Sequence, residues 1–508
     1  MEYNLNKTTV GVLSSALDAV SEQPVDIDFT LPDYCPDIEK ILRCKIIPKI
    51  YNRNLSGGQL QIDGTTVVNI LYTDSKNNVR ACEQSLPFNA SFSLKEVPDN
   101  PIIETDVKCE YLNCRPLSQR RLTIHGAFSL YAKVYTKGEL DLYSPTEDSE
   151  LEFNTEEITV SALSALCQEQ FSVGDEVQVV NKPPVELILD SDVRAVISDY
   201  KIVSGKILFN GDLNVRLIYI NNADPSAVNQ LDYSIPFSKS VDCNDLSEDT
   251  EAGVKVTLLS YDIRLKNDIL SETPIVNIDS RICVSVTGYN SENVTVVLDA
   301  YSTDFNTEIE KSRICISELT NVIEDSFMLK DSISVSDCDI SEVIDFNVKY
   351  DLINSSLNDD KAKLSSKLTV NILAQNSSGE PEYIERAVEF DKEIEVSGFN
   401  NIVNVSAEVM SVSYRIADNG TIELRCEIKY SLILENNKAY TIVTSINVDE
   451  DNKIKKRNCA LVLYYSDENE SLWDIAKRYN TKMSLIIDEN SLGEDSLTNS
   501  KMLLIPMV

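Results

Sequence analysis

The chain has 508 residues, of which 43% are hydrophobic, and this allows roughly three or four domains with cores of their own. With 82 acidic against 46 basic residues, the net charge of −36 excludes nucleic acid and anionic membrane surfaces as expected partners. No apolar run reaches the roughly 18 residues that span a bilayer, and residues 1–23 show no signal peptide. We therefore expect a cytoplasmic protein without membrane insertion.

A strand-like run recurs three times along the chain, which indicates an internal repeat. In each copy Val, Ile, Thr and Tyr alternate with polar residues, as in half-buried antiparallel strands. Gly64 of the first copy aligns with Gly211 of the second. The three runs are LQIDGTTVVNILY at 60–72, ILFNGDLNVRLIY at 207–219 and AKLSSKLTVNILA at 362–374.

The same register holds on both sides of these runs. Downstream, LPF, IPF and VEF align in the same order, and each unit ends in a second alternating run that begins at Leu122, Ile275 or Thr421. Upstream, the aligned segments are PDIEKIL at 36–42, PPVELIL at 183–189 and CDISEVI at 338–344. The chain therefore carries three related β-rich units of about 150 residues, each large enough for its own core.

These units predict a mainly β fold with three tandem β-sandwich or barrel-like domains, because such packing buries one face of several half-buried strands. The linker NVDEDNKIKKRN lacks an apolar period and is expected to be a flexible tether. The predicted domains are 1–150, 151–310 and a degenerate third copy at 311–446, followed by the linker at 447–458 and a C-terminal module at 459–508. Short helices are predicted before the sheets at 11–20, 161–169 and 316–323, with junctions at 146–154 and 306–311.

The sequence offers little material for catalysis. The single His, His125, lies in a strand-like run without a nucleophile motif, and a tolerated strand residue is the simpler interpretation. Asp33, Asp37 and Glu39 would suit acid–base chemistry or calcium, but turn and helix capping beside two prolines explains them more simply. The 12 Cys form no C-x-x-C pair, and buried thiols are their default. We predict no enzyme, no cofactor and no metal site.

The last stretch of the chain reads as strand, helix, helix, strand. Ser471 precedes a helical pattern and has Asp474 three residues on, an acidic form of the capping box. Asn480 is a predicted left-handed C-cap, and Thr481 is the predicted cap of a second helix. A short closing strand at 502–505 ends at Pro506. The residues predicted to form the core of this module are Tyr464, Leu472, Ile475, Met502 and Leu503.

This stretch resembles a LysM module, a small βααβ domain, in SLWDIAKRYN at 471–480, in Glu489-Asn490 and in MLLIP at 502–506. Such modules commonly bind N-acetylglucosamine polymers in a groove between the loop before the first helix and the loop after the second. Here residues 468–471 replace the usual Pro-Gly-Asp-Thr turn, although Asn469 can take a positive φ, and the second loop at 491–500 is longer and acidic. A protein ligand is therefore expected, and a peptidoglycan-binding cell-wall or cortex protein is the alternative.

LPDYCPDIEKIL at 31–42 and SDYKIVSGKILFNGDLNVRLIY at 198–219 resemble the SPOCS domain of spore-forming Firmicutes. Repeats of that domain followed by one LysM resemble the family of clostridial SpoIVA-interacting proteins, which are coat-morphogenetic scaffolds. The resemblance implies a protein of the mother-cell cytoplasm that helps to assemble the spore coat around the forespore. It also implies that the LysM holds the coat-basement ATPase. From the repeated β units we expect the three β domains to drive self-association or docking in a spore envelope layer.

The predicted partner-binding surface centres on Trp473, the only Trp of the chain. It lies about 100° round the helix from Leu472, at the edge of the apolar stripe, so partial exposure is expected. Trp is enriched in interface hot spots, whereas packing against the neighbouring strand is the alternative interpretation. The other predicted contact residues are Leu472, Lys477, Asn469, Ser471 and Asn490.

Overall fold

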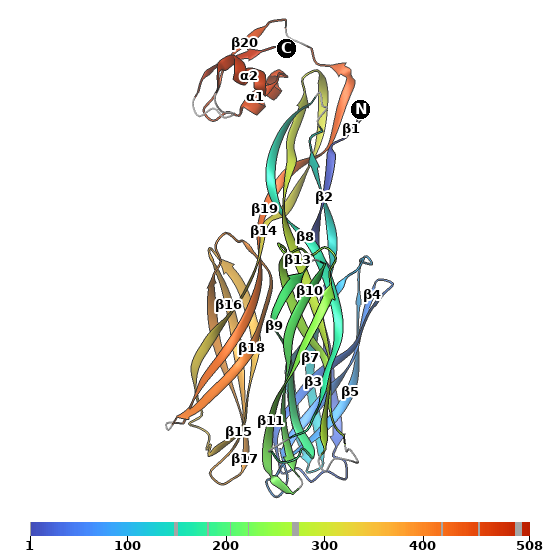
Figure 1. Cartoon of the computed structure of the whole chain (residues 1–508), viewed down its shortest axis with the longest axis vertical. Coiled ribbons are helices and arrows are strands. Elements are labelled where there is room, and N and C mark those ends of the chain that lie inside the picture. The colour runs from blue at the N-terminus through green and yellow to red at the C-terminus, as the bar shows by residue number, and fades with distance from the viewer. Residues whose placement is uncertain are drawn as a thin grey trace.

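The computed structural model describes residues 2–146, 151–179, 182–203, 205–221, 223–266, 274–417, 420–455, 458–492 and 500–507. It confirms the predicted fold class, because the chain is mainly β with two short helices near its C-terminus. Figure 1 shows a broad body, a narrower stalk above it and a small C-terminal module at the end of the stalk. Among these residues no helix is long and apolar enough to cross a membrane.

The body consists of three units, each built from a short and a long antiparallel sheet. The short sheets are β3-β4-β5, β9-β10-β11 and β15-β16-β17, and the strand that aligns in the repeat is central in each. The long sheets are β2-β7-β6, β8-β13-β12 and β14-β19-β18, the last with β1 added to β19. The strands are β1 Glu2–Tyr3, β2 Asn6–Thr30, β3 Lys40–Ser56, β4 Gln59–Thr73, β5 Val79–Ser93, β6 Ile102–Ser118, β7 Arg121–Ser144, β8 Leu151–Val177, β9 Leu187–Val203, β10 Lys206–Asn221, β11 Asp224–Asp242, β12 Glu251–Lys266, β13 Ile275–Ser302, β14 Phe305–Ser334, β15 Glu342–Asn358, β16 Lys361–Gln375, β17 Pro381–Glu395, β18 Asn401–Ala417 and β19 Thr421–Lys453.

Each unit buries the apolar faces of its two sheets against one another, as a sandwich does. Val68, Val215 and Val370, which align in the repeat, are buried in the three cores. In unit 2 a disulfide between Cys167 of β8 and Cys243, just after β11, also joins the two sheets. The repeat in the sequence is therefore a repeat of one two-sheet unit.

A glycine opposite a phenylalanine recurs in the short sheets. Gly64 pairs with Phe88 across β4 and β5, and Gly211 pairs with Phe237 across β10 and β11. A Cβ at either glycine would clash with this ring and with a neighbouring backbone carbonyl oxygen. The glycine therefore leaves room for the ring in the core, and the third copy keeps a small residue, Ser366, at the aligned place.

The stalk consists of three two-stranded ribbons, because the long strands continue past the sandwiches. The ribbons β2–β7, β8–β13 and β14–β19 wind around one another and bury a common apolar core (Figure 1). Leu142, Val296 and Ile442, one from each ribbon, are fully buried in this core. β1 pairs with β19, so the first strand of the chain joins the third unit.

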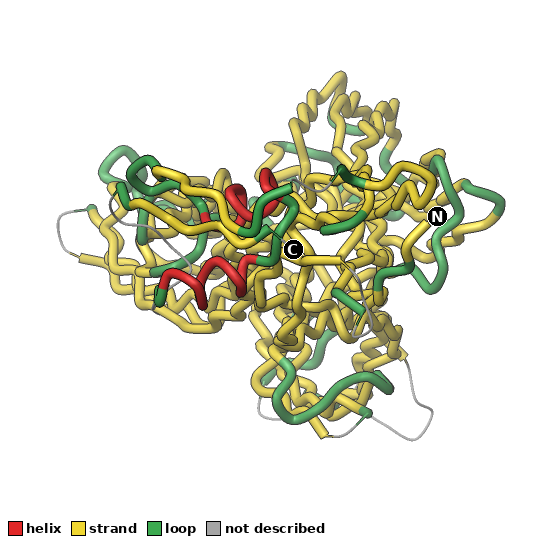
Figure 2. The backbone as a smooth tube through the Cα atoms, turned by 90° about the horizontal axis from the view of Figure 1, so that it is seen from above, coloured by secondary structure: helices red, strands yellow, loops and turns green. Residues whose placement is uncertain are grey.

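The three units also meet in the body, where Figure 2 shows them as lobes around a common centre. Leu42, Leu189 and Ile344 align in the repeat, and each is the extra residue of a β-bulge. A bulge redirects a side chain, and here it places all three residues in one apolar cluster between the units. The same cluster contains the aligned residues Leu71, Ile218 and Leu373. The three repeated units are thus arranged with approximate three-fold symmetry around this cluster.

The prediction of three short helices is wrong. Residues 11–20, 161–169 and 316–323 lie in the strands β2, β8 and β14. Each segment contains a β-bulge, after Ser15 in β2 and at the corresponding places in the other two strands. The extra residue shifts the two-residue alternation by one position, which hides the strand pattern in the sequence.

The predicted linker and one predicted junction are wrong in part. β19 runs to Lys453 and pairs with the start of β14, so residues 447–453 and 306–311 belong to the stalk. Backbone pairing holds this polar segment in a strand without apolar alternation. The predicted boundary at 310–311 consequently falls inside β14. Residues 147–150 of the other junction and 456–457 of the linker lie outside the described residues.

The C-terminal module consists of β20 (Leu461–Tyr465), α1 (Leu472–Tyr479), α2 (Met483–Asn490) and β21 (Met502–Pro506). β20 and β21 pair antiparallel. Ser471 caps α1 as predicted, with the Asp474 amide donating to its hydroxyl, and Asn480 ends the helix in the left-handed conformation. Thr481 does not cap α2, because the residue at the N-cap is Lys482, which makes no side-chain capping bond.

Candidate interaction site at the stalk tip

One carboxylate joins the C-terminal module to the upper end of the stalk. Asp299, near the end of β13, accepts a hydrogen bond of 2.8 Å from Nε1 of Trp473 on its Oδ2. Lys477 Nζ donates to both of its oxygens, at 2.8 and 2.7 Å. Lys311 Nζ of β14 lies 3.1 Å from Oδ1. Asp299 therefore links unit 2, unit 3 and the module.

An aromatic contact stands beside this carboxylate. The rings of Tyr301 and Trp473 meet edge to face with centroids 4.9 Å apart. The Tyr301 hydroxyl donates to the carbonyl oxygen of Thr481 at 2.7 Å. Lys482 Nζ lies 3.5 Å from Glu152 of β8. Contacts from α1 and from the connection between α1 and α2 thus hold the module on the stalk, and Tyr301 belongs to the apolar core of the module.

The electrostatics of Asp299 favour the docked arrangement. Its side chain is 14% exposed, and burial by itself raises the pKa of a carboxyl. Hydrogen bonds from Lys477, Trp473 and Lys311 outweigh burial, so the pKa of Asp299 is held below its ordinary value. The group is therefore ionised at neutral pH, and release of the module would remove two of its three donors.

The structure contradicts the expected exposure of Trp473. The residue is 7% exposed, because the face of α1 that carries Trp473 rests on the stalk. Leu472 is fully buried in the apolar core of the module. Lys477, a predicted contact residue, pairs with Asp299 of the stalk. The alternative interpretation of Trp473, packing against a strand, describes the contact, although that strand is β13 of unit 2.

The other predicted contact residues lie at the turn before α1 and at the end of α2. Asn469 and Ser471 are exposed, and Asn469 takes the expected positive φ of 58°. Asn490 instead joins α2 to β21: its amide donates to the Leu504 carbonyl oxygen, and its Oδ1 accepts from the Leu504 amide at 2.7 Å. Residues 493–499 of the second predicted loop lie outside the described residues.

The sequence analysis missed the stalk half of this site. Asp299, Tyr301 and Lys311 lie in the repeat region, far along the chain from the module. A bulge between Val297 and Asp299 sets the direction of the Asp299 side chain. No residue pattern in the sequence predicts this bulge. One signal was present, namely an acidic residue inside the apolar run VTVVLDAY. A buried carboxylate of this kind needs a partner.

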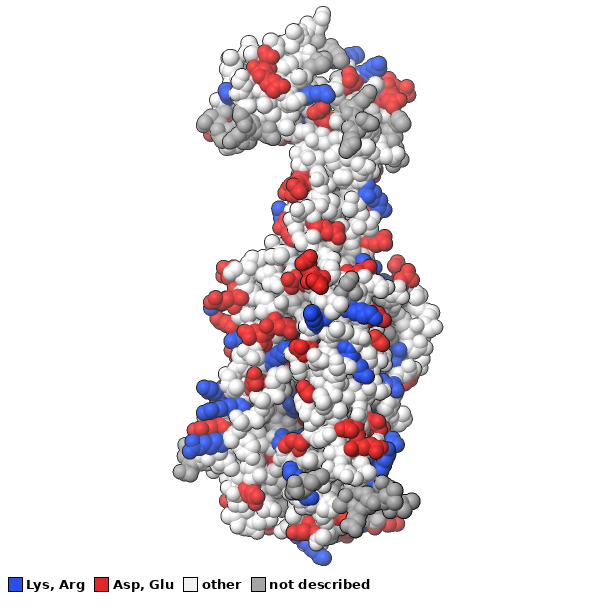
Figure 3. Space-filling model, in the orientation of Figure 1, with Lys and Arg blue, Asp and Glu red and all other residues white. Residues whose placement is uncertain are grey.

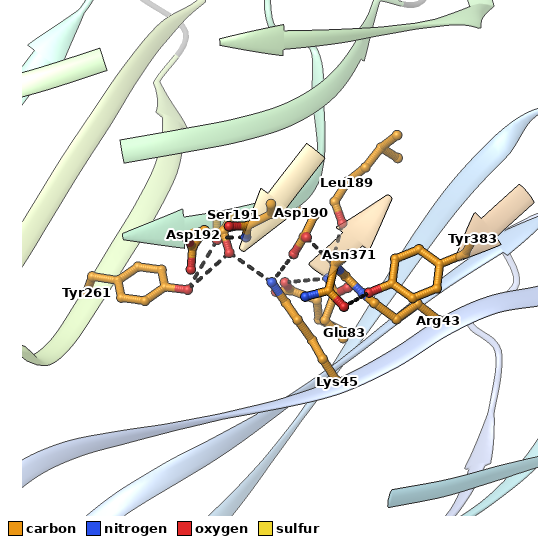
Figure 4. Close-up of polar contacts among 12 residues, drawn as sticks. Arg43, Lys45, Glu83, Leu189, Asp190, Ser191, Asp192, Tyr261, Asn371 and Tyr383 are labelled. Atoms are coloured by element: carbon orange, nitrogen blue, oxygen red, sulfur yellow. Dashed lines mark hydrogen bonds and ion pairs between the residues drawn. The ribbon is translucent and has the colours of Figure 1, made fainter. Parts of the chain in front are cut away.

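A second polar cluster lies between the units in the body (Figure 4). Arg43 and Lys45 of β3 both pair with the buried carboxylate of Asp190 on β9. Burial raises the pKa of this carboxyl, but the two cations outweigh it and hold the pKa below its ordinary value. The Arg43 guanidinium also lies 5.4 Å from the ring centroid of Tyr383 on β17. All three units therefore meet at Arg43.

At one aligned position of the repeat, the three units carry residues of different charge. Arg43, Asp190 and Asp345 directly follow the three bulged residues of the apolar cluster between the units. Arg216 Nε lies 3.0 Å from Asp345 Oδ1, yet burial raises the pKa of Asp345 to about 6. Opposite charges at aligned places allow the units to pack, whereas three like charges would repel one another. The units are therefore not interchangeable.

A small cavity of about 140 Å³ opens between units 2 and 3. Its polar lining includes Glu324, Glu408 and Lys429. Burial raises the pKa of Glu408 to about 7, with Lys429 opposing the shift and Glu324 adding to it. The volume is well below the roughly 300 Å³ of small-molecule sites, so the cavity suits a few water molecules.

The residues considered for catalysis are held in surface contacts. His125 Nδ1 pairs with Asp26 across β2 and β7, and its Nε2 lies 3.4 Å from the Tyr111 hydroxyl. Asp37 accepts a bond of 2.6 Å from Arg120, whose guanidinium also binds backbone carbonyl oxygens of the 31–35 loop. Among the described residues no group of three or more His, Cys, Asp or Glu is placed to hold a metal ion.

A comparison with known protein families found a match in each of units 1 and 2. The family described as SipL, SPOCS domain, matches residues 37–117 and 184–266. Units 1 and 2 resemble SPOCS domains. Each match runs from the loop before the short sheet to the end of β6 or β12, and the ribbon strands of the stalk lie outside it. The matches support a relation to a SipL-like family of sporulation proteins. No curated protein and no solved structure was found to match the chain.

Proposed function

We propose that the chain is a non-enzymatic scaffold of the spore coat, whose C-terminal LysM-like module binds a protein partner. The link to sporulation rests on the SPOCS matches in units 1 and 2. The observation that carries the scaffold role is the packing of three related units into one body that holds the module at the far end of a stalk. From the family resemblance, the partner is the coat-basement ATPase at the forespore surface, on the mother-cell side.

The order of elements supports a LysM-like module. Two antiparallel strands flank two helices, and the turn before α1 keeps a left-handed residue at Asn469. A partner that binds the docked module would meet the exposed residues Asn469, Ser471 and Arg478 near α1. Trp473 becomes available only when the module leaves the stalk, whereas Leu472 belongs to the apolar core of the module.

A pull-down of the coat-basement ATPase by the purified full chain tests the proposal, and recovery of the ATPase is expected. Trp473→Glu and Asp299→Asn both weaken the contact with the stalk, but only the first changes a surface of the module. If the released Trp473 contacts the partner, Asp299→Asn binds at least as well as wild type and Trp473→Glu loses binding. If the module must be held on the stalk, both variants lose binding. A wild-type chain that recovers no ATPase would contradict the proposed partner.

A glycan ligand is the second candidate, and the positive φ of Asn469 favours it because the turn before the first helix of sugar-binding LysM modules has a similar form. Titration of the full chain with chitin oligomers separates the two candidates. The scaffold proposal expects no binding at micromolar oligomer, whereas saturable binding that Asn469→Ala weakens would favour the glycan.

A further inference from the structure

The outer face of the β20–β21 sheet is apolar and uncovered. Its four most exposed residues are Leu461, Leu463, Tyr465 and Met502, at 46%, 61%, 74% and 51%. Leu504 and Pro506 of β21 pair with Leu463 and Leu461 and are half-buried. None of these six residues is charged. Met502 was expected in the core, and that prediction is wrong because the residue lies on this face.

Two other apolar surfaces of the module are covered, among the residues that the structure describes. The inner face of the sheet packs on the two helices through Val462, Leu503 and Ile505. The Trp473 side of α1 rests on Asp299 and Tyr301 of the stalk. Figure 1 shows β20 at the outer edge of the module, with α1 and α2 between it and the stalk. In the described part of the module, the outer sheet face is therefore an apolar surface that docking leaves open.

We propose that this face binds the same face of a second copy of the chain, in a tip-to-tip dimer. A two-stranded sheet buries only one of its faces within the module, and a flat apolar β face is best covered by another one. The pairs Leu461–Pro506, Leu463–Leu504 and Tyr465–Met502 form a compact patch. Two such patches meet around a two-fold axis, the commonest symmetry of protein dimers.

The exposed area fits a weak dimer. Large apolar side chains present on the order of 200 Å² each when fully exposed, so the four exposed fractions leave roughly 450 Å² per copy. Two copies would bury about 900 Å² of apolar surface, which lies in the range of weak and reversible interfaces. A contiguous patch of about 450 Å² is comparable to the largest apolar patch of an ordinary monomer, and such patches are often functional.

The charge of the chain favours contact at the tip. A net charge of −36 makes two bodies repel one another, and Figure 3 shows acidic side chains spread over the visible face of body and stalk. The stalk places the module, and with it the β20–β21 sheet, far from the body (Figure 1). Tip-to-tip contact consequently keeps the two acidic bodies apart, and higher salt should strengthen it by screening the remaining repulsion.

The inference goes beyond the proposed function and does not depend on the ATPase. The test is sedimentation velocity of the purified full chain from low to high micromolar concentration. Two variants with matched exposure serve as comparison: Leu463→Lys in the patch, and Leu117→Lys on β6, where the leucine is 62% exposed. A second pair is Met502→Lys and Met328→Lys, since both methionines are 51% exposed.

Wild type should shift reversibly toward dimer as concentration rises, and salt should increase the shift. Leu463→Lys and Met502→Lys should remain monomeric, while Leu117→Lys and Met328→Lys behave as wild type. A wild type that stays monomeric throughout would overturn the dimer, as would a dimer that persists in Leu463→Lys. If wild type is monomeric but Leu463→Lys loses the ATPase in the pull-down, the face belongs to the partner instead. The dimer is then rejected, while the proposed function stands.

Discussion

Trp473 and Asp299 lie 174 residues apart in the chain and share a hydrogen bond of 2.8 Å. The contact joins the last module to the middle one of three related units. Lys311 of the third unit approaches the same carboxylate, so the tip of the stalk closes only when these three parts are folded. The three-unit body and the C-terminal module are therefore joined by specific contacts, and the geometry of the stalk decides which faces of the module are open.

Replacement of Asp299 by Asn should loosen the module. The amide keeps the shape of the carboxylate but loses the charge that two lysines neutralise. Charge-assisted hydrogen bonds contribute about 1.5–3 kcal/mol, so tryptic cleavage in the segment 453–455 should accelerate about tenfold or more. Glu292→Gln, an exposed carboxylate on the same strand, is the control. Equal cleavage rates for both variants would mean that Asp299 does not hold the module.

Asp190→Asn should destabilise the body, because it leaves Arg43 and Lys45 without their buried counter-charge. Loss of one partner of a buried pair costs about 3–5 kcal/mol, which should lower the denaturant midpoint. Asp242→Asn, which removes a 74% exposed partner of Lys206, should change stability by less than about 1 kcal/mol. The pKa of Asp190 is lowered in the folded chain, so its contribution is present above the ordinary value of 3.8 and is lost as the pH falls below it. Similar losses for the two variants would argue against a structural role for the central cluster.

Gly211→Ala should lower the melting temperature. The added Cβ would clash with the Phe237 ring and with a carbonyl oxygen of the adjacent strand. Overpacking of this kind costs about 1–3 kcal/mol. Asn214→Ala, an exposed position on the same strand, is the matched control and should have little effect. A melting temperature unchanged by Gly211→Ala would show that unit 2 can open this space without loss.

Glu408→Gln should stabilise the protein at alkaline pH. The folded-state pKa of Glu408 is raised from 4.5 to about 7, so the folded form binds a proton more tightly than the unfolded form between these values. The ionised group therefore destabilises the folded chain progressively from pH 4.5 to 7 and fully above 7. The gain of the variant, on the order of 1–3 kcal/mol, should be absent below pH 4.5. Unfolding midpoints at pH 4, 6 and 8 measure it, and a gain independent of pH would contradict burial of the ionised group.

The sequence repeat allowed the three β units to be predicted, whereas the strands of the stalk were not predicted. Period-two alternation in the runs at 60–72, 207–219 and 362–374 identified β4, β10 and β16 correctly. The bulges in β2, β8 and β14 shift that alternation, and the segments around them were taken for helices. The polar stretch after Asn447 was read as a tether, because its pairing with β14 leaves no local pattern.

Only the part of the candidate site that lies in the C-terminal module could be predicted from the sequence. The capping residues Ser471 and Asn480 follow local rules, and both occur as predicted. The burial of Trp473 depends on Asp299 and Tyr301, which come to it through the fold of unit 2 and the length of its ribbon. Contacts across such separations leave no spacing in the sequence, so the stalk half of the site could be found only in three dimensions.

Fluorescence quenching of Trp473 tests the central claim most directly, because the chain has no other Trp. With the module docked, the indole is 7% exposed, and acrylamide should quench the full chain weakly, with emission at short wavelength. Asp299→Asn should move the emission to longer wavelength and raise the quenching constant several-fold, while the far-ultraviolet spectrum stays that of a β protein. Wild-type emission and quenching equal to those of a free indole in water would contradict the docked module and the scaffold built on it.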